Sequence, residues 1–210
     1  MKLILSSCDF RDVFSKKVIL DNLPNSIEDC RVLFIPNEKA TPEIIKTNLY
    51  PERLASFGFC KENIVVFNHA DAESFKGLDI DVIYVSGGNT FGTLDKIRKS
   101  SFDQAIIDYV KSGATFIGGS AGAHIVTKSI EHVKRYDENN TDLKDFSGLG
   151  LFNGVLICHY TPERREHLNE LEKQGKYKIQ HLTDSDTLVV TDSEIILSTQ
   201  YGTFAEEYKG

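Results

Sequence analysis

A serine flanked by small residues lies in the middle of the chain. Residues 118–122 read Gly-Gly-Ser-Ala-Gly, which fits the pattern G-x-S-x-G, and they lead from a β-rich segment into a helical one. A serine on such a sharp turn has strained backbone angles, so neighbouring side chains would clash, and its hydroxyl projects above the sheet. The pattern predicts that Ser120 is a nucleophile. The N–H of Ala121, the first helical residue, then points to the place where an oxyanion forms.

A second glycine-rich turn follows an apolar segment that ends at Val85. Residues 86–90 read Ser-Gly-Gly-Asn-Thr. In a parallel sheet this turn and the Ser120 turn share the carboxyl edge, where the N–H of Gly88 would complete an oxyanion hole. Both turns also have simpler interpretations. The segment around Ser120 suits a tight helix–sheet contact or a phosphate cradle, and residues 86–90 suit a plain strand-to-helix loop.

A hydroxyl nucleophile needs a general base, and histidine is the usual one. We favour His159 because it stands at the end of an apolar strand and hence at the active edge, whereas His124 and His167 lie within helical patterns. The histidines that compete for this role are His69, His124, His132, His159, His167 and His181.

The third member of such a triad is a carboxylate that orients the imidazole. Asp184 and Asp186 follow a predicted strand that ends near His181, and Asp137 lies in a polar loop. Residue spacing alone leaves these alternatives open.

Strand and helix patterns alternate through the first 130 residues. Apolar, β-rich runs at 2–5, 31–36, 63–68, 81–85 and 115–118 predict strands, and residues 41–57 and 102–111 predict helices, the first capped by Thr41 with Pro42 at its first position. Strands separated by helices favour right-handed crossovers and a parallel sheet covered on both faces. Ligands of such sheets bind at the carboxyl ends of the strands.

The second half of the chain begins with a charged, polar segment at 131–147, which predicts an exposed loop near the active edge. A strand at 154–158, a charged helix at 163–174 and strands at 178–181, 187–190 and 194–198 follow, the last two as a hairpin. Because the chain has no internal repeat and no Pro/Gly linker, we expect residues 1–210 to form one domain.

Composition excludes several classes of protein. The formal net charge of −7 argues against a nucleic-acid or anionic-membrane surface. The four cysteines have no metal-ligand or C-x-x-C spacing, so we expect reduced thiols and no metal. The chain has no signal-peptide pattern and no apolar stretch long enough to span a membrane, which favours a cytoplasmic location.

Two of these segments resemble the dipeptidase E (aspartyl dipeptidase) family of serine peptidases, relatives of cyanophycinase. Residues 85–91, Val-Ser-Gly-Gly-Asn-Thr-Phe, and residues 117–123, Ile-Gly-Gly-Ser-Ala-Gly-Ala, carry the resemblance, which extends over most of the chain. It implies an α/β three-layer sandwich with a mostly parallel central sheet, similar to the class I glutamine amidotransferase fold. It also implies that Ser120 is the nucleophile and His159 the base, with Gly88 and Ala121 as oxyanion donors.

The resemblance bears on the acid and on specificity as well. Family members carry a Glu at the position that matches Asp184, whereas Asp137 matches a loop aspartate of the family and is the alternative acid. A preference for an N-terminal aspartate requires cations near the nucleophile, and Arg164 and Arg165 are the candidates for substrate binding.

These observations together predict a serine peptidase that hydrolyses short peptides, Asp-Xaa dipeptides among them, through an acyl-enzyme. We expect no cofactor, no nucleic-acid or membrane partner, and a monomer or homodimer. One alternative is an α/β-hydrolase esterase, although its histidine usually lies near the C-terminus. The other is a non-catalytic Rossmann-like module that binds a small ligand, although no G-x-G-x-x-G follows the first strand.

Overall fold

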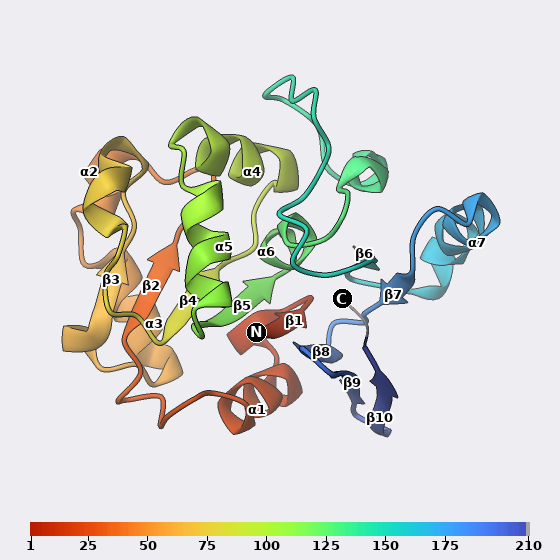
Figure 1. The fold of residues 1–210 in the computed structure, drawn as a ribbon, viewed down its shortest axis with the longest axis horizontal. Helices are drawn as coiled ribbons and strands as arrows, with labels where there is room; N and C mark the ends of the chain where they lie inside the picture. The colour runs from red at the N-terminus through yellow and green to blue at the C-terminus, as the bar shows by residue number, and fades with distance from the viewer. Residues whose placement is uncertain (209–210) are drawn as a thin grey trace.

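The computed structural model describes residues 1–208 and centres on one large sheet (Figure 1). Its eight strands run in the order β10-β9-β8-β1-β5-β4-β2-β3. The five strands from β1 to β3 along this order pair in parallel, and β8, β9 and β10 add an antiparallel edge. The strand bounds are β1 Lys2–Ser6, β2 Val32–Ile35, β3 Ile64–Val66, β4 Val82–Val85, β5 Thr115–Gly119, β8 Thr187–Thr191, β9 Glu194–Thr199 and β10 Gly202–Glu207.

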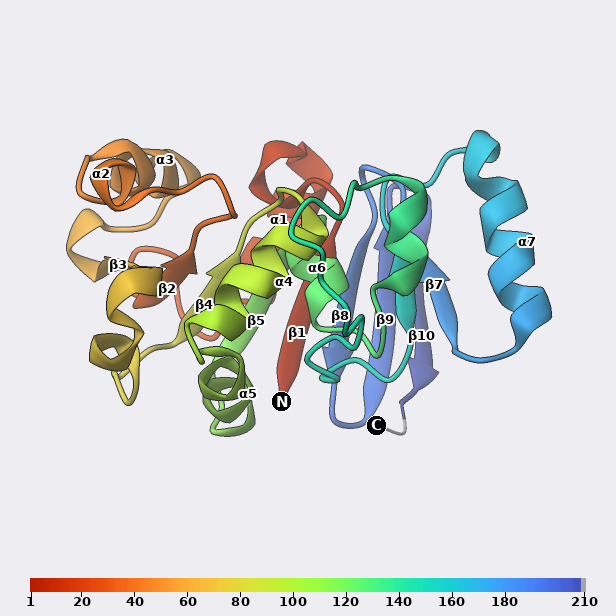
Figure 2. The same cartoon turned by 90° about the horizontal axis from the view of Figure 1, so that it is seen from above.

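Helices cover both faces of this sheet, as Figure 2 shows from above. Successive side chains of a strand point to opposite faces, so Leu3 and Leu5 pack into one apolar cluster while Ile4 packs into the other. The first cluster includes buried residues of α4 (Thr90–Lys99), α5 (Asp103–Lys111) and α6 (Ala121–Ile125), and the second includes those of α1 (Val13–Asp21) and α3 (Leu49–Phe57). The predicted α/β architecture with a mostly parallel central sheet is confirmed.

One predicted helix is wrong in detail. Residues 41–57 form two helices, α2 (Pro42–Ile45) and α3, with Thr41 capping the first as expected. The Thr47 hydroxyl donates to the carbonyl of Ile44 at 2.7 Å and accepts from the N–H of Leu49 at 3.3 Å. Because a side chain takes over backbone groups that a continuous helix would pair, the chain turns between the two helices.

The sequence patterns missed two α-helices and one strand, α1, α4 and β10, as well as the short 3₁₀-helices. Both helices begin at side-chain caps: Asp12 accepts from Ser15 N, and Asn89 accepts from Gly92 N. Gly92 lies within α4, where glycine disfavours a helix, and this weakens the pattern. Strand β10 is exposed along its whole length, so it has no apolar alternation to detect.

The strand that precedes His159 does not join the large sheet. Strands β6 (Val155–Ile157) and β7 (Ile179–His181) pair in parallel in a separate sheet of two strands, and α7 (Arg165–Gln174) connects them. Both views place α7 at the end of the molecule away from α2 and α3 (Figures 1 and 2). Within residues 1–208, none of the helices has the length and apolar character needed to cross a bilayer.

Candidate active site

Ser120 occupies the turn between β5 and α6 with a strained backbone. Its φ of 49° and ψ of −106° lie where side chains are rarely found. A Cβ at Gly122 would overlap the carbonyl oxygen of Val85, and one at Gly118 would lie 2.7 Å from the carbonyl oxygen of Gly122. The small residues around Ser120 are therefore required by close backbone packing, as the pentapeptide predicts.

His159 faces Ser120 from the end of the small sheet. Its Nε2 lies 3.0 Å from Ser120 Oγ, which is hydrogen-bonding distance for transfer of the serine proton. His159 also has a positive φ, 52°, so a second strained backbone position turns the imidazole toward the nucleophile. The histidine favoured from its strand-end position is the one that meets the serine.

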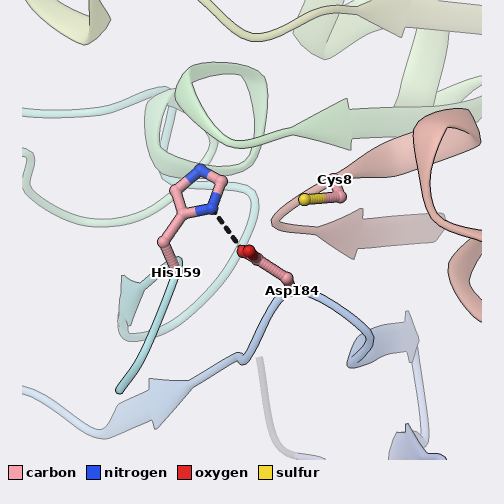
Figure 3. A group of neighbouring side chains, drawn as sticks. All are labelled: Cys8, His159 and Asp184. Atoms are coloured by element: carbon pink, nitrogen blue, oxygen red, sulfur yellow. Dashed lines mark hydrogen bonds and ion pairs between the residues drawn. The ribbon is translucent and has the colours of Figure 1, made fainter. Parts of the chain in front are cut away.

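Asp184 meets the other side of the imidazole. Its Oδ1 lies 2.6 Å from His159 Nδ1 (Figure 3), and this hydrogen bond is the main cause that lowers the pKa of Asp184. The carboxylate sits on a turn closed by Asp186, whose Oδ2 accepts from the N–H of Thr183 at 2.8 Å. A carboxylate held on Nδ1 keeps that proton in place and leaves Nε2 free to accept one from the serine.

Asp137 lies elsewhere. Its Oδ2 accepts a hydrogen bond of 2.7 Å from the backbone N–H of Thr90, at the start of α4. Asn89 donates to the carbonyl of the next residue, Glu138, at 2.9 Å. Asp137 therefore anchors its loop to the turn that contains Gly88, and the geometry favours Asp184 as the partner of the imidazole.

The two predicted oxyanion donors come from neighbouring turns. Ala121 begins α6, and in residues 1–208 neither its N–H nor that of Gly88 donates to a protein acceptor. A Cβ at Gly88 would lie 2.5 Å from Asn37 Cβ and 2.6 Å from Glu38 Oε2, so only glycine allows this turn to pack against the segment after β2. Gly88 is exposed at this turn, whereas Ala121 is fully buried.

The predicted substrate-binding arginines differ in their surroundings. Arg164 donates to the carbonyl of Cys158 at 2.5 Å and lies 3.8 Å above the ring of Tyr136. It therefore sits beside the residue that precedes His159. Arg165, at the start of α7, is exposed.

A cation that the sequence patterns missed, Arg11, also lies near Ser120. A Cβ added at Gly87 would lie 3.5 Å from Arg11 Nη2 and 3.4 Å from Ser120 Cβ, so both side chains reach the turn at Gly87. Arg11 is half exposed, and its Nε donates to the buried carboxylate of Asp9 at 3.1 Å. The rule that ligands bind where parallel strands end could have found it, since Arg11 follows β1 closely.

Two further side chains border the triad. His124 is fully buried, which lowers its pKa well below the ordinary value, and its Nε2 accepts from the N–H of Cys158 at 3.4 Å. Cys8 follows β1 beside Asp184, and burial, then the Asp184 charge, raises the pKa of its thiol to about 11. A protonated thiol is a poor nucleophile, so Cys8 does not rival Ser120.

A hollow of about 440 Å³ opens next to the triad. Asp184, Tyr160 and Tyr201 are among the residues that line it. A second hollow of about 450 Å³, lined by His132, His167 and other residues, contains no member of the triad. The first is therefore the better candidate for holding part of a substrate.

The chain is similar to known peptidases over most of its length. Residues 3–198 match the model of a family described as peptidase family S51. The chain is 24% identical over 203 residues to the uncharacterized peptidase Lmo0363 of Listeria monocytogenes, covering 93% of this chain and 98% of that protein. It is 30% identical over 170 residues to the uncharacterized peptidase PM1590 of Pasteurella multocida, covering 77% and 78%. It is also 30% identical over 132 residues to peptidase E of Citrobacter koseri, covering 63% and 54%.

Solved structures share the fold. A Listeria monocytogenes protein described as a candidate peptidase E superimposes with a TM-score of 0.73 at 22% identity, over 94% of this chain and 98% of that one. A peptidase from an acI-B1 actinobacterium superimposes with a TM-score of 0.60 at 17% identity, over 100% and 96%.

Proposed function

Because the chain belongs to peptidase family S51 and is a serine-type peptidase, we propose that it cleaves short peptides through an acyl-enzyme formed on Ser120. The observation that carries this proposal is the continuous chain of contacts from Ser120 Oγ through the two nitrogens of His159 to Asp184, at 3.0 and 2.6 Å. Contacts of this length support Ser120 as the nucleophile, His159 as the base and Asp184 as the orienting acid.

The proposed reaction uses protein groups and water. Ser120 Oγ attacks the peptide carbonyl while His159 Nε2 takes its proton, and the N–H groups of Gly88 and Ala121 stabilise the oxyanion. His159 then gives the proton to the leaving amine. Water hydrolyses the ester by the same steps, with His159 again as the base.

The proposed substrates are small and carry an N-terminal aspartate. The hollow of about 440 Å³ beside Asp184, whose lining includes neither Ser120 nor His159, has room for part of a short peptide and not for a folded chain. Arg11, near Ser120, and Arg164, near His159, are the cations that favour a carboxylate in the substrate. Of the two, Arg11 is the better candidate because its Nη2 lies near Gly87 and Ser120, while its contacts with Asp9 and the carbonyl of Cys8 go through Nε.

Labelling by a fluorophosphonate, followed by assay on a panel of dipeptides, tests the nucleophile. We expect the native chain to be labelled and to hydrolyse dipeptides, and Ser120→Ala to lose both, with turnover falling by several orders of magnitude. Ser185→Ala is the matched control, because Ser185 lies next to Asp184 but its hydroxyl bonds Asp12 at 3.2 Å. Near-native turnover in Ser120→Ala would refute the mechanism.

A further inference from the structure

A cysteine, a histidine and an aspartate, three residue types that bind metals, lie together at the Asp184 end of the triad. Cys8 follows β1, His159 follows β6, and Asp184 lies between β7 and β8. One ligand atom from each lies within 4.8 Å of the other two, and Figure 3 shows the three side chains facing one another. Among residues 1–208 this is the one group of three His, Cys, Asp or Glu side chains that meets this criterion.

The donor set suits a thiophilic divalent cation. Thiolate, imidazole nitrogen and carboxylate oxygen are the ligands that Zn²⁺ uses, and three protein ligands with a water in the fourth position is a common arrangement. Ligand atoms around a tetrahedral Zn²⁺ lie about 3.5 Å apart. The thiol must therefore approach, and the 2.6 Å His159–Asp184 contact must widen.

The surroundings allow this adjustment. The side chains of His159 and Asp184 are 35% and 66% exposed, so both can rotate and a cation can enter from solvent. Cys8 is itself partly exposed. The contact that must open is a single hydrogen bond at the surface.

We propose that Cys8, His159 and Asp184 form an inhibitory Zn²⁺ site, in which the metal binds Cys8 Sγ, His159 Nδ1 and a carboxylate oxygen of Asp184. On binding, the Cys8 S–H bond breaks and its proton goes to solvent. The metal replaces the proton on His159 Nδ1, and Nε2 of the same ring takes up a proton. One proton is released for each ion bound.

Inhibition follows from the tautomer that the metal selects. Nδ1 gives its lone pair to Zn²⁺, so Nε2 carries a hydrogen and cannot accept the proton of Ser120, 3.0 Å away. Asp184 is also withdrawn from orienting the ring. This consequence rests on the proposed function, whereas metal binding itself does not.

Zn²⁺ inhibition of dipeptide hydrolysis is the first test. We expect micromolar to submillimolar Zn²⁺ to inhibit, EDTA to reverse the inhibition, and Cys8→Ser to raise the half-inhibitory concentration by at least about tenfold. Cys60→Ser is the matched control: Cys60 Sγ also lies near a carboxylate, 2.9 Å from Glu62, but forms no three-ligand group within residues 1–208. It should keep native sensitivity. Equal sensitivity of Cys8→Ser and the native chain would overturn the proposal.

Direct binding of Co²⁺ to Ser120→Ala tests the site without any hydrolysis. A thiolate ligand gives Co²⁺ a near-ultraviolet charge-transfer band, which we expect at one ion per chain, displaced by Zn²⁺ and lost in Ser120→Ala combined with Cys8→Ser. Absence of the band in Ser120→Ala would overturn the metal site. If Ser120→Ala shows the band but the native chain hydrolyses no peptide, the metal site is confirmed and the proposed function is refuted.

Discussion

The hydroxyl of Ser7 connects the two segments that carry the base and the acid. Ser7 Oγ accepts from the backbone N–H of His159 at 2.9 Å and donates to the carbonyl of Leu182 at 3.0 Å. Ser7 is fully buried and directly follows β1. One small polar side chain at the end of a central strand thus connects the backbone of His159, whose φ is positive, to the segment that leads to Asp184.

Ser7→Ala should therefore weaken catalysis without touching the substrate. It leaves the backbone N–H of His159 without its acceptor, which costs about 1–3 kcal/mol of folding free energy, and it loosens the imidazole. The carbonyl of Leu182 still accepts from the N–H of Tyr160 at 2.8 Å. We expect kcat to fall by about 10- to 100-fold with little change in KM. Ser15→Ala is the control, because Ser15 is equally buried but its hydroxyl has no partner within residues 1–208. An unchanged kcat in Ser7→Ala would refute this positioning role.

The two candidate acids should respond differently to neutralisation. Asp184→Asn removes the carboxylate that holds His159 Nδ1–H, so turnover should fall by up to ~10⁴-fold with little change in apparent substrate binding. Asp137→Asn should have a smaller effect, because this carboxylate caps the Thr90 N–H and does not contact the imidazole. Steady-state kinetics of the two variants decide, and a larger loss in Asp137→Asn would transfer the role to Asp137.

Specificity should depend on a cation close to Ser120, and Arg11 is the first to test. If Arg11 binds the substrate carboxylate, Asp-Xaa should exceed Asn-Xaa in kcat/KM by about 10- to 150-fold, the value of a charged hydrogen bond of roughly 1.5–3 kcal/mol. Arg11→Met should bring this ratio close to one, and Arg11→Lys should restore part of it. Arg165→Met is the exposed control.

Competition between the two dipeptides in each variant measures this ratio. Arg164→Met belongs in the same series, and loss of the ratio there but not in Arg11→Met would assign recognition to Arg164. A native ratio near one would remove the preference for aspartate.

Stability should fall as the pH drops below neutrality, and His132 is one cause. Burial is the main reason that its pKa is lowered from 6.5 to about 4, and its Nε2 lies 2.7 Å from the carbonyl oxygen of Leu156. Between these two pH values the unfolded chain binds the proton and the folded chain does not. The histidine's contribution is therefore complete above pH 6.5 and is lost progressively toward pH 4, by up to about 3 kcal/mol.

Urea unfolding of the native chain and of His132→Gln across this range measures that contribution. Glutamine retains an amide donor for Leu156 but does not titrate, so its stability should depend less steeply on pH. His69, whose pKa burial also lowers to about 4, should leave a residual slope in the variant. Identical pH slopes for the two proteins would contradict the assignment.

Local sequence was sufficient to predict the strained turn at Ser120 and much of the sheet. The glycines around Ser120 are dictated by contacts of their own turn and of the adjacent strand, so the pentapeptide signals its conformation directly. Apolar runs likewise predict β1, β2, β4 and β5, because strands buried on both faces tolerate little else. Exposed β10 and glycine-containing α4 gave no such signal.

The partners of the His159 imidazole are set by the tertiary structure alone. His159 and Asp184 are 25 residues apart, and Ser7 is 152 residues from His159. Spacing in the chain does not encode such distances, so spacing left both Asp184 and Asp137 open, and only the family resemblance favoured Asp184 over Asp137. Ser7, at the end of β1, binds the segments that follow β6 and β7, and His159 and Asp184 thereby lie next to Cys8. Local sterics determined the turn that presents Ser120, whereas packing between distant segments decided what surrounds it.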